Sequence, residues 1–251
     1  MKKTISRWLD SDVGYSFRTS PVAIGAAAIA LVCVFCALFA GWVAPHNPFD
    51  LAALELGDAR LPPAWHADGS TKYLLGTDDQ GRDILSALIY GARISLIVGV
   101  VSVVLSVAIG VVFGLLAGFF GGWFDTILSR LTDIFFAVPL VLAAIVIMQV
   151  FSGSRGVLTV VAVLAAFGWT QIARITRGSV LSVKNNDFVT AAEAIGEPRW
   201  RIAVFELGPN LVVPLLAETG LRLTYSIGTV AAIGFLGFAS NRKPADRGPT
   251  G

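Results

Sequence analysis

Long runs without a charged residue are the feature that most constrains this chain. A charge at the centre of a bilayer costs about 3 kcal/mol even on lenient scales, and a helix needs about 20 apolar residues to cross the hydrocarbon. Five apolar runs are long enough or nearly so: residues 22–44, 94–124, 134–154, 156–173 and about 211–238. The runs predict an all-α, polytopic membrane helical bundle with five helices. Only 14% of residues are charged, whereas a soluble domain carries about 25%.

The fifth run contains two charged residues, Glu218 and Arg222. Their i, i+4 spacing allows them to pair on one face of a helix. The alternative is a helix that begins at Leu223 and leaves both residues in water. The pattern leaves both alternatives open.

Basic residues predict the orientation, because loops rich in Lys and Arg stay in the cytoplasm. Two segments separated by four helices carry them: Lys2, Lys3, Arg7 and Arg18 in the N-terminal tail, and Arg174, Arg177, Lys184, Arg199 and Arg201 after the fourth helix. We therefore expect a cytoplasmic tail at 1–21, a first membrane helix at 22–44, an extracytoplasmic loop at 45–91, and a core at 92–240 with a cytoplasmic loop at 174–210. A polar tail follows at 241–251.

No pattern predicts a metal, nucleotide or nucleic-acid site. Cys33 and Cys36 have C-x-x-C spacing but lie within an apolar run without a further ligand, and His46 and His66 stand alone in the outer loop. Phosphate-binding glycine motifs are absent from the sequence, and the net charge of +2 is too small to suggest nucleic acid. If the chain moves a solute uphill, the energy is expected to come from another subunit.

Glycine recurs every four residues in the second run, at Gly110, Gly114, Gly118 and Gly122. Small residues at this spacing allow two membrane helices to approach closely. Helix packing is the favoured interpretation, and lining of a pore is the alternative. In the third run, Pro139 predicts a kink.

The cytoplasmic segment predicts two short helices joined by a bend. Residues 189–195 suit a helix with Asp187 as its cap, Gly196 suits a left-handed helix end, and Pro198 suits the first turn of the next helix. Such a knob either docks in the groove of a partner or packs as a lid on its own bundle. Physical reasoning alone does not decide between them.

The segment resembles the EAA loop of permease subunits of ABC importers. The loop pattern is Thr190-Ala191-Ala192-Glu193-Ala194-Ile195-Gly196 followed by Leu207-Gly208-Pro209-Asn210. Further stretches are similar to the C-type permeases of the dipeptide, oligopeptide and nickel family: Leu75 to Asp83, Tyr90 to Leu96, Gly118 to Trp123, and Phe235 to Gly237.

This resemblance implies a MetI-like ABC permease fold of about six helices in the bacterial inner membrane. It implies a homologous second permease, two ABC ATPases that bind ATP and Mg, and an extracytoplasmic substrate-binding protein as partners. The chain itself would hold no cofactor and catalyse nothing. The implied ATPase-coupling residues are Thr190, Ala191, Ala192, Glu193, Gly196, Leu207, Pro209 and Asn210. The solute would be a short peptide or a related molecule, with nickel chelates and glutathione-like cargo left open.

The sequence also departs from the family pattern. Thr190 stands where the family usually has Glu, and Gly208 where it usually has Leu. The tail at 241–251 replaces the expected last helix, so we expect a truncated chain or a five-helix variant. A non-transporting paralogue and an ion-coupled secondary carrier, which would use Glu218 and Arg222, are the alternative functions.

Overall fold

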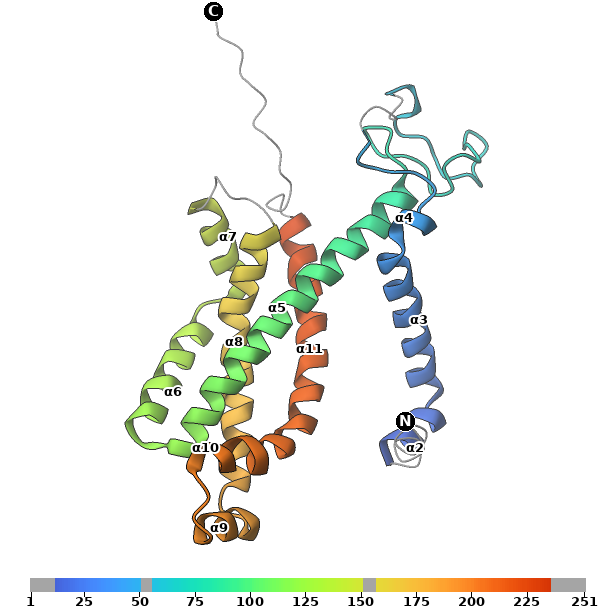
Figure 1. Cartoon of the computed structure of the whole chain (residues 1–251). Coiled ribbons are helices and arrows are strands. Elements are labelled where there is room, and N and C mark those ends of the chain that lie inside the picture. Colours follow the sequence, from blue (N-terminus) through green and yellow to red (C-terminus); the bar gives the residue numbers. More distant parts are fainter. Residues whose placement is uncertain (1–11, 51–55, 151–156, 236–251) are drawn as a thin grey trace, which may run out of the picture. The chain divides into compact units, whose positions relative to one another are not determined.

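A computed structural model describes residues 12–50, 56–150 and 157–235, and within these ranges it contains helices and loops but no strand. The chain divides into two compact units, Met1–Leu96 and Ile97–Gly251, which are described in turn (Figure 1). Four of the described helical stretches are long and apolar enough to span a membrane, or up to five if one bent pair counts as a single span. The predicted all-α polytopic fold is confirmed. The polar tail predicted at 241–251 lies outside the described residues.

The first unit begins with two helices, α2 (Asp12–Thr19) and α3 (Pro21–Leu38). Ser20 caps α3, and its Oγ accepts a hydrogen bond of 3.2 Å from the Ala23 amide. Proline at the first helical position needs no amide partner. The expected span 22–44 is not a single helix, because the chain breaks at Phe39 and continues as the short helix α4 (Ala40–Val43).

The helix that follows the loop begins before the apolar run does. Helix α5 (Ile84–Phe120) begins at residue 84, ten residues before the run that starts at 94; the extracytoplasmic boundary at 91 stays a prediction. The cause of the early helix start is Asp83, whose carboxylate accepts hydrogen bonds from the amides of Leu85 and Ser86 at 3.3 and 3.1 Å. A carboxylate in this position satisfies the free N–H groups of the first turn.

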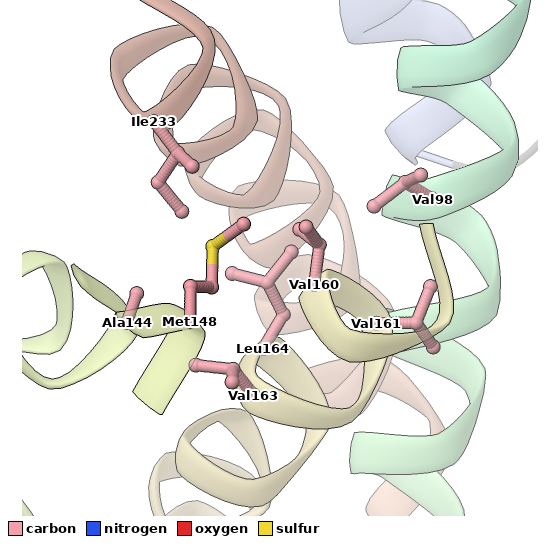
Figure 2. Close-up of a cluster of buried hydrophobic side chains, with 8 residues drawn as sticks. All are labelled: Val98, Ala144, Met148, Val160, Val161, Val163, Leu164 and Ile233. Carbon is pink, nitrogen blue, oxygen red and sulfur yellow. The ribbon is translucent and has the colours of Figure 1, made fainter. Parts of the chain in front are cut away.

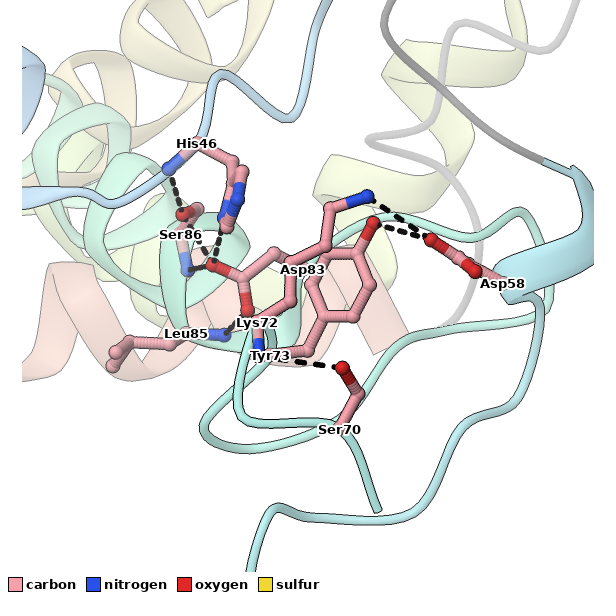
Figure 3. Close-up of polar contacts among 8 residues, drawn as sticks. All are labelled: His46, Asp58, Ser70, Lys72, Tyr73, Asp83, Leu85 and Ser86. Carbon is pink, nitrogen blue, oxygen red and sulfur yellow. Dashed lines mark hydrogen bonds and ion pairs between the residues drawn. The ribbon is translucent and has the colours of Figure 1, made fainter. Parts of the chain in front are cut away.

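Asp83 also anchors the start of the loop (Figure 3). The His46 amide donates to Ser86 Oγ at 3.0 Å, and His46 Nδ1 lies 3.4 Å from Asp83 Oδ2. The side chain of Asp83 is almost fully buried. The loop therefore leaves α4 and enters α5 through one shared polar cluster, so His46 has the structural role that its isolation in the sequence suggested.

Two further carboxylates organise the loop between these ends. Asp58, at the end of the short 3-10 helix η2 (Leu56–Asp58), accepts hydrogen bonds from Tyr73 Oη at 2.8 Å and Lys72 Nζ at 3.2 Å. The Tyr73 hydroxyl and then the Lys72 ammonium lower the pKa of Asp58. Burial raises the pKa of Asp78, but hydrogen bonds from the amides of Arg82 and Gln80 outweigh it, so the pKa is lowered.

These shifts predict that the outer loop loses stability in acid. A carboxyl whose pKa is lowered by folding stabilises the loop above its unfolded pKa, and this stabilisation disappears as the pH falls through the lower folded pKa. We expect the protection of the Thr77 amide, which bonds to the Leu61 carbonyl, to fall below about pH 4 in hydrogen exchange. Asp58→Asn should weaken protection at neutral pH and flatten its pH dependence. Equal pH dependence in the two proteins would contradict the assignment.

The described part of the second unit holds the rest of α5 and six further helical elements that lead to α11. Helix α6 (Gly122–Ala137) and helix α7 (Leu140–Val150) meet at an angle of 83°. Pro139 lies at this break, where its missing N–H removes a helical hydrogen bond. The predicted third helix, 134–154, is therefore wrong in its bounds, since most of α6 precedes it.

Ion pairs explain why α6 and α8 (Val157–Val183) extend through charged residues. Arg177 Nη2 donates to Asp125 Oδ2 at 2.7 Å, and Arg174 Nη2 donates to Asp133 Oδ1 at 2.7 Å. Each pair joins α6 to α8. Helix α8 continues for ten residues beyond the apolar run that ends at 173, to Val183. The cytoplasmic placement of 174–210 stays a prediction.

One hydrophobic cluster joins α5, α7, α8 and α11 (Gly208–Phe235) (Figure 2). Met148 of α7 and Ile233 of α11 are almost fully buried, as is Val98 of α5. Ala144 of α7 and four residues of α8 complete the cluster: Val160, Val161, Val163 and Leu164. Helix α8 thus contacts α5, α6, α7 and α11.

Three of the four predicted packing glycines allow α5 to approach α8 closely. A Cβ added at Gly110 would lie 2.5 Å from Ile172 Cβ, and one at Gly114 would lie 2.5 Å from the Ala173 carbonyl oxygen. At Gly118 the nearest atom, 2.8 Å away, belongs to Val180. Gly122 does not share this role: it begins α6 with a φ of +63° and has nothing within 4 Å of such a Cβ. The prediction that Gly122 packs against another helix is therefore wrong, because this residue lies beyond the end of α5.

The close approach predicts a large effect of one methyl group. Gly114→Ala forces the new carbon against backbone, which cannot rotate away, and overpacking of this kind costs about 1–3 kcal/mol. We expect a lower apparent unfolding temperature for the purified protein in detergent. Gly91→Ala, on the same helix with nothing within 4 Å, is the matched control and should be neutral or slightly stabilising. Equal behaviour of the two variants would contradict the packing role.

Helix α11 resolves the alternative that the fifth run left open. It is continuous from Gly208 to Phe235, with Pro214 inside it, and Arg222 Nε donates to Glu218 Oε1 at 3.0 Å. The charged pair is half-buried in the middle of the helix. A helix that begins at Leu223 is therefore excluded.

Candidate functional site

Between α8 and α11 the chain forms a compact segment, residues 187–207, which we call the knob. It consists of α9 (Asp187–Ala194), the single turn α10 (Arg199–Arg201) and η4 (Ile202–Leu207), a π-helical turn. In Figure 1 the knob lies at the end of the second unit where α8 ends and α11 begins. Four of its residues, Val189, Ala192, Ile202 and Leu207, are buried in a cluster with the adjoining ends of α8 and α11. Leu115 and Phe119 of α5 pack against this cluster.

The start of α9 differs from the prediction. Asn186, in an extended conformation with φ −72° and ψ 155°, is the N-cap, and Asp187 is the first helical residue. Asp187 was expected to be the cap. Its negative charge instead lies in the first turn, where the helix dipole favours it.

The end of α9 is as the glycine predicted. Gly196 has a φ of +80°, its amide bonds to the Glu193 carbonyl at 3.0 Å, and the Glu197 amide bonds to the Ala192 carbonyl at 3.1 Å. This pair of bonds is a Schellman motif, which satisfies the last carbonyls of a helix. It also turns the chain sharply, so that α10 can begin directly after Pro198.

The π-helical turn η4 was not predicted. It ends at Leu207, immediately before Gly208 and Pro209. Proline cannot donate the hydrogen bond that a regular helix needs, and π-turns within helices often occur at functional sites. The proline in a long apolar pattern is the only sequence signal that marks an irregular turn here.

The structure separates the predicted coupling residues into two groups. Thr190, Ala191, Glu193 and Gly196 are exposed on the outer side of the knob, as are Pro209 and Asn210 in the first turn of α11. Ala192 and Leu207 are buried, so they hold the knob on its own bundle. Asn210 Nδ2 donates to the Glu206 carbonyl at 2.8 Å, which links the start of α11 to η4.

Large apolar side chains on the outer side of the knob were not among the predicted site residues. We call this surface the docking face; it comprises Phe188, Ile195, Trp200, Val204 and Phe205. Ile195 is 78% exposed and Trp200 is 63% exposed. The rings of Trp200 and Phe205 pack at 6.3 Å. Large exposed apolar side chains that gather on one element are typical of interaction sites.

The knob packs on its own bundle, as one of the two interpretations predicted; docking to a partner stays a prediction. The inner side packs on the bundle, and Lys184 Nζ donates to the Gly118 carbonyl at the C-terminal end of α5 at 3.3 Å. A cation is favourable at that end of a helix. The outer side presents the docking face. The knob is thus one packed element that connects the docking face to the α5–α8 pair.

The fold and the knob define a multi-pass membrane protein with a small amphipathic element at one end of a helical bundle. The family model for the binding-protein-dependent transport system inner membrane component matches residues 110–242, and the model for the N-terminal TM domain of oligopeptide transport permease C matches residues 6–63. The chain is 44% identical over 227 residues to the dipeptide transport system permease protein DppC of Escherichia coli (strain K12), covering 90% of this chain and 73% of that protein.

Two more relatives extend the comparison. The oligopeptide transport system permease protein OppC of Bacillus subtilis (strain 168) is 34% identical over 236 residues, covering 94% of this chain and 73% of that protein. The glutathione transport system permease protein GsiD of Shigella flexneri is 35% identical over 227 residues, covering 89% and 71%. The chain belongs to the family of inner membrane permease components of binding-protein-dependent transport systems, and the resemblance noted in its sequence is confirmed.

The left-handed residue of the Schellman motif predicts a local defect. Gly196→Ala places a Cβ in a backbone conformation that costs about 1–2 kcal/mol for other residues. We expect amides at the end of α9 to exchange about 5–30 times faster with solvent, while the bundle stays folded. Gly178→Ala, at an exposed helical position with nothing within 4 Å of the new carbon, should leave exchange unchanged. If the amides at the end of α9 exchange at the same rate in Gly196→Ala as in the unaltered protein, the assignment is contradicted.

Proposed function

We propose that this chain is the permease subunit of an ATP-driven importer and forms part of the pathway for short peptides. The observation that carries the proposal is the docking face on a knob that is itself packed on the bundle, in a chain of this family. An exposed apolar surface outside the membrane needs a partner, and a knob rigidly joined to α5, α8 and α11 can transmit the partner's motion to the helices.

The partner of the docking face is proposed to be an ABC ATPase. Two such ATPases would bind ATP and Mg and would perform all of the chemistry, so this chain would hold no cofactor and catalyse nothing. A homologous second permease would complete the pathway, and an extracytoplasmic substrate-binding protein would deliver the solute. Membrane lipid would surround the pair, and no nucleic acid is involved.

The orientation that suits this proposal has the N-terminus and the knob in the cytoplasm. Four crossings separate them if α6 and α7 together form one broken span: α3, α5, the α6–α7 pair and α8. An even number of crossings places both segments on one side. The basic residues in the tail and near the knob favour the cytoplasmic side for both.

A peptide is the proposed solute because relatives with high identity are dipeptide and oligopeptide permeases. A glutathione permease is also among the relatives, and glutathione is itself a small peptide. The shared chemistry is a short chain with charged ends. Competition between unlabelled dipeptides, tripeptides and glutathione for uptake would rank these solutes.

The docking face predicts a charge-sensitive interaction with the ATPase. Trp200→Glu places a charge in the proposed contact, and truncating or charging a central aromatic residue commonly costs 2 kcal/mol or more. We expect at least a tenfold loss of co-purified ATPase from co-expressed subunits. Trp65→Glu alters another mostly exposed tryptophan, at 76%, in the outer loop and should retain the ATPase. Unchanged co-purification in Trp200→Glu would overturn the docking proposal.

Transport itself tests the whole proposal. Proteoliposomes that contain the complete importer should accumulate labelled dipeptide only when the ATPases have ATP and Mg. Uptake driven by an ion gradient without ATP would instead establish the secondary carrier. Failure of this chain to support any uptake with active partner subunits would favour the non-transporting paralogue.

A further inference from the structure

An open cavity lies between α8 and α11 of the second unit. It has a volume of about 390 Å³ and is lined by Gln171 of α8 together with Glu218, Leu221, Arg222 and Tyr225 of α11. Cavities of roughly 300–1,000 Å³ are the usual size of small-molecule sites. Neither the knob nor the packing of α5 on α8 uses these residues.

The two charged residues that line this cavity lie far from the ends of their helix. Glu218 and Arg222 lie ten and fourteen residues from the start of α11 at Gly208, and Arg222 lies thirteen residues from its described end at Phe235. At 1.5 Å per residue, the pair is about 15–20 Å from either end of the helix. Gln171 of the facing helix lies near the end of the apolar run 156–173, three residues before Arg174. Glu218 and Arg222 themselves lie well inside a long apolar helix, where ionisable residues normally face a water-filled space or a bundle interior.

The ion pair keeps unused bonding capacity that faces the cavity. It joins Arg222 Nε to Glu218 Oε1, whereas a guanidinium has five N–H donors and a carboxylate has two oxygens. The side chains are 21% and 13% exposed, so solvent or solute can reach them. Gln171 adds an amide donor and acceptor from the facing helix, and Tyr225 adds a hydroxyl.

The spacing of the pair matches a small zwitterion. Side chains at i and i+4 have Cβ atoms about 6 Å apart, and two extended residues span about 7 Å. A dipeptide carries an ammonium at one end and a carboxylate at the other. Its carboxylate can replace Glu218 on the guanidinium in a bidentate contact, while its ammonium pairs with the freed Glu218 carboxylate.

We propose that Gln171, Glu218 and Arg222 form a solute site for zwitterionic short peptides midway along the translocation pathway. The site offsets the cost of moving two charges through the centre of the membrane, and the intrahelical ion pair re-forms when the solute leaves. This assignment rests on the proposed importer function and deepens it. It also gives the two charged residues of α11 a role that requires no coupling ion.

The first test compares variants in proteoliposomes containing the complete importer, with a saturating labelled dipeptide. Arg222→Gln is expected to lower the uptake rate at least tenfold, while the amount of co-purified ATPase stays unchanged. Arg222→Lys, which keeps the charge, should restore a large part of the rate. Arg130→Gln makes the same substitution at an exposed arginine of α6 and should transport normally.

A second measurement does not depend on the charged residues. With Cys33 and Cys36 replaced by alanine, Gln171→Cys is exposed to a water-soluble cationic thiosulfonate reagent. We expect the reagent to modify the introduced thiol, and to modify it at least five times more slowly when dipeptide saturates the importer. This result would support the site even if Arg222→Gln fails to assemble.

The outcomes separate the two proposals. If the unaltered importer moves dipeptide but Arg222→Gln moves it equally fast, or if Gln171→Cys is inert or unprotected, the solute site is overturned and the importer function stands. If the unaltered importer, with active ATPases, moves no dipeptide, both proposals are overturned.

Discussion

The close contact between α5 and α8 is the interaction on which the rest of the second unit depends. Three glycines remove side chains where Ile172, Ala173 and Val180 approach. Apolar side chains are as stable in lipid as in protein, so the hydrophobic effect does not drive membrane helices together. Close packing between the helix backbones must therefore supply much of the free energy of helix association. With α8 held in this position, its N-terminal half joins the cluster with α7 and α11, and its C-terminal end carries the knob.

Charge pairing is the second organising principle. Arg174 and Arg177 extend α8 beyond its apolar run because aspartates of α6 pair with them. Glu218 and Arg222 pair within α11 in the same way. Partnered charges are tolerated in or next to membrane helices, whereas isolated ones are expelled. A helix end predicted from a charge-free run therefore comes too early in the chain where the charged residues that follow pair with another helix.

The knob combines rigidity with an available surface. Its buried residues join it to the ends of three long helices, while its outer apolar side chains remain uncovered in this chain. These two properties explain why the predicted coupling residues include both buried and exposed side chains. Ala192 and Glu193 are adjacent in sequence, yet one packs on the bundle and the other faces outward, because successive helical residues are separated by about 100°.

The sequence by itself determined the class of fold, the family and the left-handed end of α9. These follow from apolar length, from motif spacing and from the tolerance of glycine for positive φ, all of which are local properties. The tertiary structure decided which charges are paired, that Asp83 begins α5, that α6 and α7 form a bent pair, and that Gly122 does not pack. It alone brought Gln171 to Glu218 and Arg222 and assembled the docking face. Those features depend on contacts between residues far apart in the chain, for which the local pattern contains no signal.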